Sequence, residues 1–304
     1  MLVAKNSKSN RKLFRKHKID GFELLATPYF AIVLILILLP VLMIGLYAFL
    51  GNETTSDMLV FSFENFVRFF SSKENLIALW KSLKLALIST IICLVIGYPF
   101  AYFIAGASTK VRNGLILLVT APMWINMLLR VYAWRQIFDM QGPLNSILGW
   151  FGIEAIDFLA YDFAAIIGMV YVYLPFMIIP IYTTLMKIER SYIESALDLG
   201  ANPKQVFSKI ILPLSIPGVL SGVTMVLLPT ATTLVIPEYL SKNNYALIGN
   251  LIEMNFKSGG DWGYGSAVSL ILGAIIMILV FMANRFDRLG DAKEKSSIRS
   301  VKKI

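Results

Sequence analysis

Six long apolar runs constrain this chain more than any other feature. Most hold roughly 20 residues, the length that a helix needs to cross the hydrocarbon core of a membrane. We place them at 29–50, 85–104, 115–129, 164–185, 216–236 and 266–284. Only 15% of the 304 residues are charged, whereas soluble domains carry about a quarter. The sequence therefore predicts an all-α integral membrane protein with six transmembrane helices in a domain at 29–284.

The positions of the basic residues predict how this domain is oriented. Six spans place both termini on one side of the membrane. Twenty of the 28 Lys and Arg residues fall in the tails 1–28 and 285–304, in the turn 108–113 and around the polar loop 190–213. Basic residues gather on the cytoplasmic side of membrane proteins. We therefore expect cytoplasmic tails that contact anionic lipid of the bilayer, and no nucleic acid.

The polar loop 190–213, between the fourth and fifth runs, has the pattern of two short helices and a sharp corner. Ser191 and Glu194 have the spacing of a capping box for the first helix. Gly200 follows where that helix would end in a left-handed residue. Asn202, Pro203 and Gln205 then supply a cap, a first-turn proline and a second capping-box partner.

Both short helices carry an apolar face that something must cover, because helices of roughly two turns are unstable alone in water. The first face holds Ile193, Ala196 and Leu197, and the second holds Val206, Phe207, Ile210 and Ile211. Two interpretations remain open at this point. The loop folds back on its own membrane domain, or it docks on a partner.

Two features of the fifth run predict a close helix contact. Gly218 and Gly222 form a G-x-x-x-G face that lets another helix approach. Pro229 frees a backbone carbonyl, which is tolerated only beside protein or a watery cavity.

The chemistry that most membrane machines need is missing from the six runs. They contain no Asp, Glu, Lys, Arg or His, which pumps use as relays. The single histidine, His17, lies in the basic tail, and the single cysteine, Cys93, lies in an apolar run, so a clustered metal site is not expected. No phosphate-binding loop of the form G-x-x-x-x-G-K-[ST] occurs. A membrane-embedded enzyme is therefore disfavoured, and the chain is a passive channel or is powered by a partner.

The polar loop resembles the signature loop of permease subunits in bacterial ABC importers. The matching residues are Glu194, Ala196 and Gly200, and then Ile210, Leu212 and Pro213. Ser195 replaces the usual second alanine, and Asp198 lies within the same stretch. The resemblance implies a type I ABC importer permease fold in the bacterial cytoplasmic (inner) membrane, with the loop docked on a P-loop ATPase subunit that binds the ATP. The chain itself would then need no cofactor, and Pro213 would join the loop to the fifth span with little slack.

Other stretches are similar to spermidine/putrescine permeases, specifically to the first of the two permeases of such systems. They are Gly97-Tyr-Pro-Phe-Ala-Tyr, Pro122-Met-Trp-Ile-Asn, Arg130-Val-Tyr, Tyr173-Leu-Pro-Phe-Met-Ile-Ile-Pro, Ile248-Gly-Asn-Leu-Ile and Asp261-Trp-Gly-Tyr-Gly-Ser-Ala. This resemblance implies a second homologous permease, two ATPase copies and an extracytoplasmic substrate-binding protein as partners. Related permeases for ferric iron or thiamine share parts of these patterns, so another small solute is the alternative cargo.

A path for polyamines should offer aromatic faces and oxygen acceptors, because cations are attracted to both. The candidate residues are Trp124, Asn126, Tyr171 and Tyr173, with Asp162 and Glu238 as carboxylates at the entrance. The simpler interpretation treats Trp and Tyr near span ends as interfacial anchors, and the carboxylates as solvated surface groups.

Overall fold

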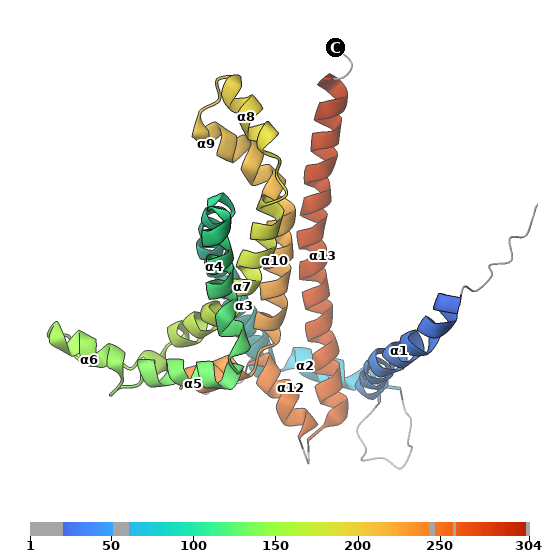
Figure 1. Cartoon of the computed structure of the whole chain (residues 1–304). Coiled ribbons are helices and arrows are strands. Elements are labelled where there is room, and N and C mark those ends of the chain that lie inside the picture. Colours follow the sequence, from blue (N-terminus) through green and yellow to red (C-terminus); the bar gives the residue numbers. More distant parts are fainter. Residues whose placement is uncertain (1–20, 51–60, 243–246, 258–259, 302–304) are drawn as a thin grey trace, which may run out of the picture.

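The computed structural model describes residues 21–50, 61–242, 247–257 and 260–301. It is built from helices (Figure 1), and within the described residues the one β pairing is a single bridge between Leu50 and Phe61. The first half comprises α1 (Gly21–Ala48), α2 (Glu64–Ser71), α3 (Lys73–Gly106), α4 (Thr109–Thr120), η1 (Ala121–Trp124), α5 (Met127–Phe138), α6 (Pro143–Trp150) and η2 (Phe158–Ala160). The second half comprises α7 (Asp162–Leu185), α8 (Arg190–Asp198), α9 (Pro203–Val206), the π-helical segment η3 (Phe207–Ile211), α10 (Leu212–Thr232), α11 (Val235–Leu240), α12 (Ile248–Phe256) and α13 (Trp262–Val301).

The apolar runs fold as helices, but not all of them as single straight spans. Among the described residues, four helices are long and apolar enough to cross a membrane: Lys73–Gly106, Asp162–Leu185, Pro203–Thr232 and Trp262–Met282. The pair Thr109–Trp124 and Met127–Trp150 is also apolar enough when taken together, but it is bent by 92°, the geometry of a broken span or of a re-entrant loop. The remaining predicted run, 29–50, contains the shorter apolar helix Ile32–Ala48.

Two predicted span boundaries are wrong. The run 115–129 breaks at Ile125, whose backbone is extended, because Asn126 then caps a new helix through its side-chain oxygen, which accepts from the amide of Leu128. The run 216–236 ends early, since Thr233 is extended after α10 and the chain restarts as α11. The helix α13 does not end with the predicted sixth span at residue 284, but continues without a break to Val301.

The core is centred on α7, against which α3 and α10 pack (Figure 1). The predicted G-x-x-x-G contact is formed with this helix. A Cβ on Gly218 would lie 2.5 Å from Oγ1 of Thr184, and one on Gly222 would lie 2.8 Å from the sulfur of Met177. Both positions therefore need glycine for α10 to approach α7 this closely.

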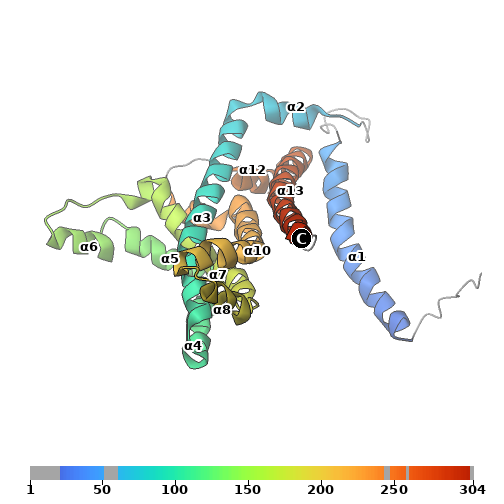
Figure 2. The ribbon, with the colours of Figure 1, turned by 90° about the horizontal axis from the view of Figure 1, so that it is seen from above.

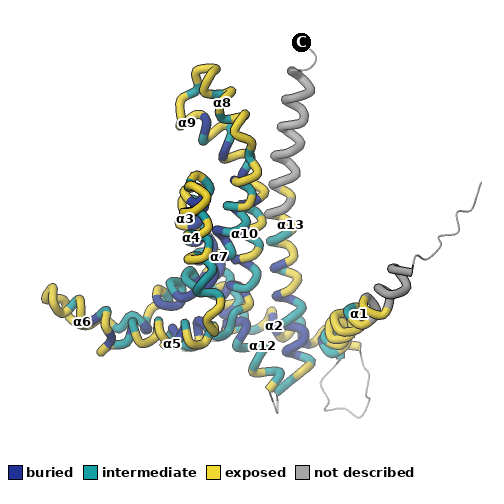
Figure 3. Tube along the Cα trace, in the orientation of Figure 1, coloured by how far each residue is buried: buried dark blue, intermediate teal, exposed yellow. Residues whose placement is uncertain are grey.

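Two ends of the bundle differ in character. We call the end that carries α8 and α9 the loop end, and the end that carries α2, α5, α6, α11 and α12 the opposite end. At the opposite end these short helices lie across the direction of the long ones, and α6 projects sideways (Figures 1 and 2). Burial concentrates where α3, α7 and α10 meet, while α1 and α6 remain mostly exposed within this chain (Figure 3).

The helix α1 leaves the bundle and contacts it only near its last turns (Figure 2). Its end packs on the start of α13, where the rings of Tyr47 and Trp262 lie 6.1 Å apart. Before these turns, from Leu34 to Leu42, the large apolar side chains are exposed, including Leu36 at 68% and Ile37 at 62%. In a membrane protein such a helix is covered by lipid or by another subunit.

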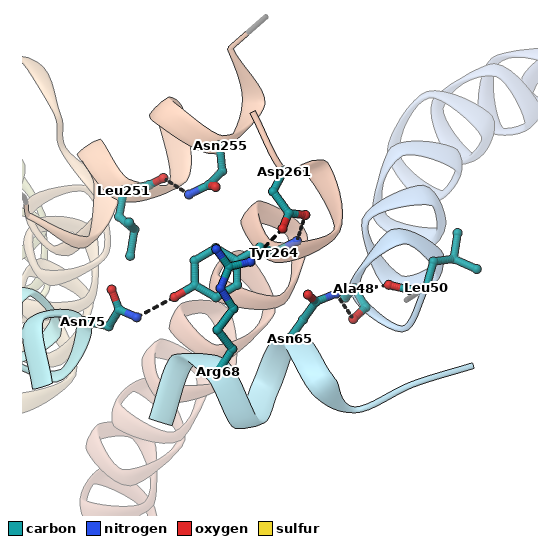
Figure 4. A network of polar contacts seen from close by, with 9 residues as sticks. All are labelled: Ala48, Leu50, Asn65, Arg68, Asn75, Leu251, Asn255, Asp261 and Tyr264. Atoms are coloured by element: carbon teal, nitrogen blue, oxygen red, sulfur yellow. Dashed lines mark hydrogen bonds and ion pairs between the residues drawn. The ribbon is translucent and has the colours of Figure 1, made fainter. Parts of the chain in front are cut away.

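A polar network ties α2 to α13 at the opposite end (Figure 4). The guanidinium of Arg68 forms an ion pair with Asp261 at 2.8 Å and lies 4.4 Å above the ring of Tyr264. The hydroxyl of Tyr264 contacts Asn75 of α3. Nearby, the side chain of Asn65 donates to the carbonyls of Ala48 and Leu50. This network gives Asp261 and Tyr264, quoted above only for their resemblance, a structural role.

Candidate functional site

The corner of the polar loop is a Schellman motif that ends α8. The amide of Ala201 donates to the carbonyl of Ala196 at 3.0 Å, and the amide of Gly200 donates to Leu197 at 2.9 Å. Gly200 has φ +85°, the left-handed conformation predicted for it. A Cβ at this position would meet nothing within 4 Å, so φ, and not crowding inside this chain, requires glycine.

The second helix start is confirmed and the first is not. Asn202 and Gln205 exchange hydrogen bonds of 2.9 Å in a complete capping box, with Pro203 at the first helical position. The predicted box of Ser191 and Glu194 is wrong. The cap residue of α8 is Glu189, two residues before the predicted one, so Ser191 lies inside the first turn, and its hydroxyl donates to the Glu189 carboxylate at 3.2 Å.

The second short helix is not a separate element. From Pro203 the chain runs through η3 into α10 as one continuous helix to Thr232. The wide π turn lies directly before Pro213, whose ring would otherwise clash with the carbonyl four residues earlier. The loop is therefore joined to the membrane-spanning helix without slack at Pro213, as predicted.

The inner faces of both short helices are covered by the chain itself. Val206 and Ile211 are buried, and Ile193, Ala196 and Ile210 pack partly buried against the main core cluster. The remaining residue of the second face, Phe207, is half-buried in the same cluster. Self-packing therefore covers both faces except at Leu197, which is 45% exposed.

The rim of the loop is exposed to solvent. Six predicted loop residues are exposed: Glu194, Ser195, Asp198, Gly200, Leu212 and Pro213. Large apolar side chains stand beside them, Tyr192 at 54%, Leu197 at 45% and Leu199 at 89% exposure. Among the described residues neither Glu194 nor Asp198 forms an ion pair. Exposed leucines beside free carboxylates make this rim a surface suited to a protein partner.

The predicted substrate-path residues lie toward the opposite end but do not form one surface. Trp124 is 76% exposed in the 92° bend, and Asn126 caps α5. In contrast, Tyr173 is buried, with only 8% of its surface exposed. The ring of Tyr171 packs in the core, 5.5 Å from the ring of Trp134. Asp162 is the first residue of α7 and half-buried, not before the span as predicted.

Glu238 is exposed on α11, next to a pair of tyrosines. The helix packs against α7, where Gly168 leaves room for Leu240. Next to Glu238, the ring of Tyr239 lies 4.9 Å from that of Tyr132. The hydrogen bond with Tyr132, followed by the charge of that phenol and by burial, raises the pKa of Tyr239 above its ordinary value, and the nearby carboxylate of Glu238 contributes in the same direction.

Two features at this end were missed from the sequence. Nε and Nη1 of Arg130 on α5 are buried without a hydrogen-bond partner in the described chain, and the residue lies near Tyr173. Its run Arg130-Val-Tyr was quoted only for resemblance. A mostly apolar pocket of about 400 Å³ also opens between α10, α12 and α13, where Glu253 contributes the charged group. The pocket contains none of the predicted path residues.

Comparison with known proteins places the chain in a family. The family described as "Binding-protein-dependent transport system inner membrane component" matches residues 97–293. The spermidine/putrescine transport system permease protein PotB of Escherichia coli is 36% identical over 260 residues, covering 84% of this chain and 94% of that protein. PotB of Haemophilus influenzae is 36% identical over 268 residues, covering 87% and 93%.

The fold is also found in a solved transporter. A chain of a bacterial alginate ABC transporter, crystallised in complex with an alginate pentasaccharide-bound periplasmic protein, superposes with a TM-score of 0.71 at 21% identity, covering 88% of this chain and 94% of that one. The predicted permease fold is thereby confirmed. The chain belongs to the family of inner membrane components of binding-protein-dependent transport systems, and it is a membrane permease.

Proposed function

We propose that this chain is a permease subunit of a polyamine importer, energised by a partner ATPase that docks on the α8–α9 loop. The observation that carries the cargo is the 36% identity, over nearly the whole length of both chains, to permeases of spermidine/putrescine transport systems. Ferric iron and thiamine are the alternative cargoes.

The docking site of the ATPase is the exposed rim around Glu194, Ser195 and Gly200. This rim stands clear of the bundle at the loop end (Figure 1) and has free carboxylates and exposed leucines. Because the loop continues into the helix Pro203–Thr232 without a break, a displacement of the rim moves α10 in the membrane. A passive channel, the alternative left open by the missing relay residues, has no use for such a device.

The remaining partners follow from the same orientation. With the loop end in the cytoplasm, an extracytoplasmic binding protein meets the opposite end, where Trp124 and Glu238 are exposed. A second permease completes the path, and the unsupported apolar length of α1 supports the presence of such a neighbour. Both termini are then cytoplasmic. The basic N-terminal cluster, assigned to lipid from the sequence, lies outside the described residues.

Uptake into cells tests the cargo. A strain that lacks this chain is supplied with it on a plasmid, and import of labelled spermidine is measured with and without unlabelled putrescine, ferric iron or thiamine. Restored import that putrescine alone reduces supports the proposal. Import of spermidine that stays at the level of the deletion strain, together with restored import of iron or thiamine, overturns it.

A further inference from the structure

The loop is attached to the membrane helices at a point that the docking rim does not explain. Between α9 and α10 the segment Phe207–Ile211 is π-helical, inside the continuous helix Pro203–Thr232. π-Helical segments make up less than about 1% of residues in proteins and are frequent at functional sites. The first residue of this one, Phe207, faces α3.

Phe207 is held between two tyrosines of α3. Its ring centroid lies 6.0 Å from that of Tyr98 and 5.5 Å from that of Tyr102, at interplanar angles of 86° and 87°. The two tyrosines are four residues apart and so share one face of the helix. Both contacts have the edge-to-face geometry that aromatic pairs prefer. The ring therefore cannot move along its helix without displacing α3 or losing both contacts.

A second attachment joins the same two helices further into the bundle. The hydroxyl oxygens of Tyr98 and Ser215 lie 2.8 Å apart, and the Ser215 hydroxyl also lies 2.9 Å from the carbonyl oxygen of Leu212. Because a serine hydroxyl has one proton, Ser215 donates to Leu212 and Tyr98 donates to Ser215. Ser215 is fully buried. Positions 207 and 215 are eight residues apart, a separation of about 12 Å along a helix.

The part of α3 that carries these tyrosines contains a proline. Pro99 follows Tyr98 directly, inside the helix Lys73–Gly106. A proline in a helix interior removes one backbone hydrogen bond and permits a local bend. The segment from Pro99 to Gly106, with Tyr102 on it, can therefore tilt relative to the rest of α3 when Phe207 pushes on it.

We propose that Phe207 is the positioning residue that transmits movement of the α8–α9 loop to α3, through its ring contacts with Tyr98 and Tyr102. This inference rests on the proposed function, because it needs an ATPase that moves the loop. According to this inference, a movement of the loop displaces α3 directly, in addition to α10, which is the continuation of the loop.

The test measures ATP hydrolysed per spermidine imported by the complete complex in proteoliposomes. Phe207→Leu removes the ring and keeps an apolar side chain, so ATPase binding should be retained while the ratio rises about ten-fold, the effect expected for the loss of two aromatic contacts. Tyr102→Leu should raise the ratio from the other side of the contact. Tyr102→Phe keeps the ring and is the matched control, with the wild-type ratio.

The outcomes separate this inference from the proposed function. A wild-type complex that neither binds the ATPase nor imports spermidine overturns both. A wild-type complex that imports, with unchanged ratios in both leucine variants, overturns the role of Phe207 alone. Failure of both leucine variants to assemble assigns the contact to folding and overturns it as well.

Discussion

Replacing Gly200 by valine should separate docking of the ATPase from folding of the permease. At φ +85° an L-residue costs about 1–2 kcal/mol, and an added Cβ would have no atom within 4 Å. A cost of this size is small against the usual stability of about 5–15 kcal/mol. The variant should therefore insert and fold, while the distorted corner moves Glu194 and Ser195 away from the partner surface.

The chain offers a matched control for this variant. Gly152, in the connection after α6 at the opposite end, also has a positive φ, +73°, and also has nothing within 4 Å. Gly152→Val should carry the same strain without touching the loop. A third variant, Gly200→Asn, keeps the left-handed corner at little cost, because asparagine tolerates this conformation.

Three measurements on these variants decide the matter: membrane yield, retention of the ATPase on purification, and spermidine uptake. We expect near-normal yield for all three variants. Gly200→Val should lose ATPase retention and lower uptake at least about ten-fold, equivalent to about 1.4 kcal/mol of docking energy, whereas Gly152→Val should keep both. Equal losses at the two glycines would refute the reasoning, because strain alone would then explain the effect.

Three further changes test other parts of the structure. Gly218→Ala places a Cβ 2.5 Å from Thr184 on α7 and should destabilise the purified protein by about 1–3 kcal/mol, whereas Gly114→Ala, which meets nothing within 4 Å, should leave the melting temperature unchanged; equal melting temperatures would contradict the close α7–α10 contact. Glu238→Gln removes an exposed carboxylate at the opposite end and should raise the KM for spermidine uptake several-fold, and an unchanged rate at all concentrations removes Glu238 from the path. Asp261→Asn breaks a partly exposed ion pair and should cost about 0.5–1 kcal/mol in thermal unfolding; a loss several times larger would mean that the network of α2 and α13 carries more of the fold than its exposure implies.

The local structure of the loop followed from short-range rules. The cap at Asn202, the left-handed Gly200 and the first-turn Pro203 all depend on backbone groups within a few residues, so the sequence was sufficient to predict them. The cap predicted at Ser191 is wrong because Glu189, two residues earlier, takes the cap position and accepts a hydrogen bond from the Ser191 hydroxyl. Several neighbouring polar residues could cap this helix. Which of them does so depends on where the helix begins, and the local sequence pattern did not predict that position.

Contacts between distant segments were less accessible from the sequence. The G-x-x-x-G face predicted a close approach but not that the partner is α7. Likewise, Phe207 was assigned to an apolar face of the loop, while its contact with Tyr98, 109 residues earlier, depends on how α3 and α10 pack. Tyr171 was a reasonable path residue by composition, yet its ring packs in the core against Trp134. Span ends carry aromatics for anchoring, for packing and for ligands, and residue type does not separate these roles.

Cross-linking at the rim of the loop tests the central claim most directly. The chain has one cysteine, the buried Cys93, so a Cys93→Ala background allows a single reactive thiol to be placed at the exposed Ser195 by Ser195→Cys, with Glu154→Cys at the opposite end as control. In the assembled, importing complex, a short thiol–thiol cross-linker should join Ser195→Cys to a cysteine in the docking groove of the ATPase and should leave Glu154→Cys unlinked. A complex that imports spermidine but gives no adduct at position 195, or equal adducts at both positions, would contradict the account.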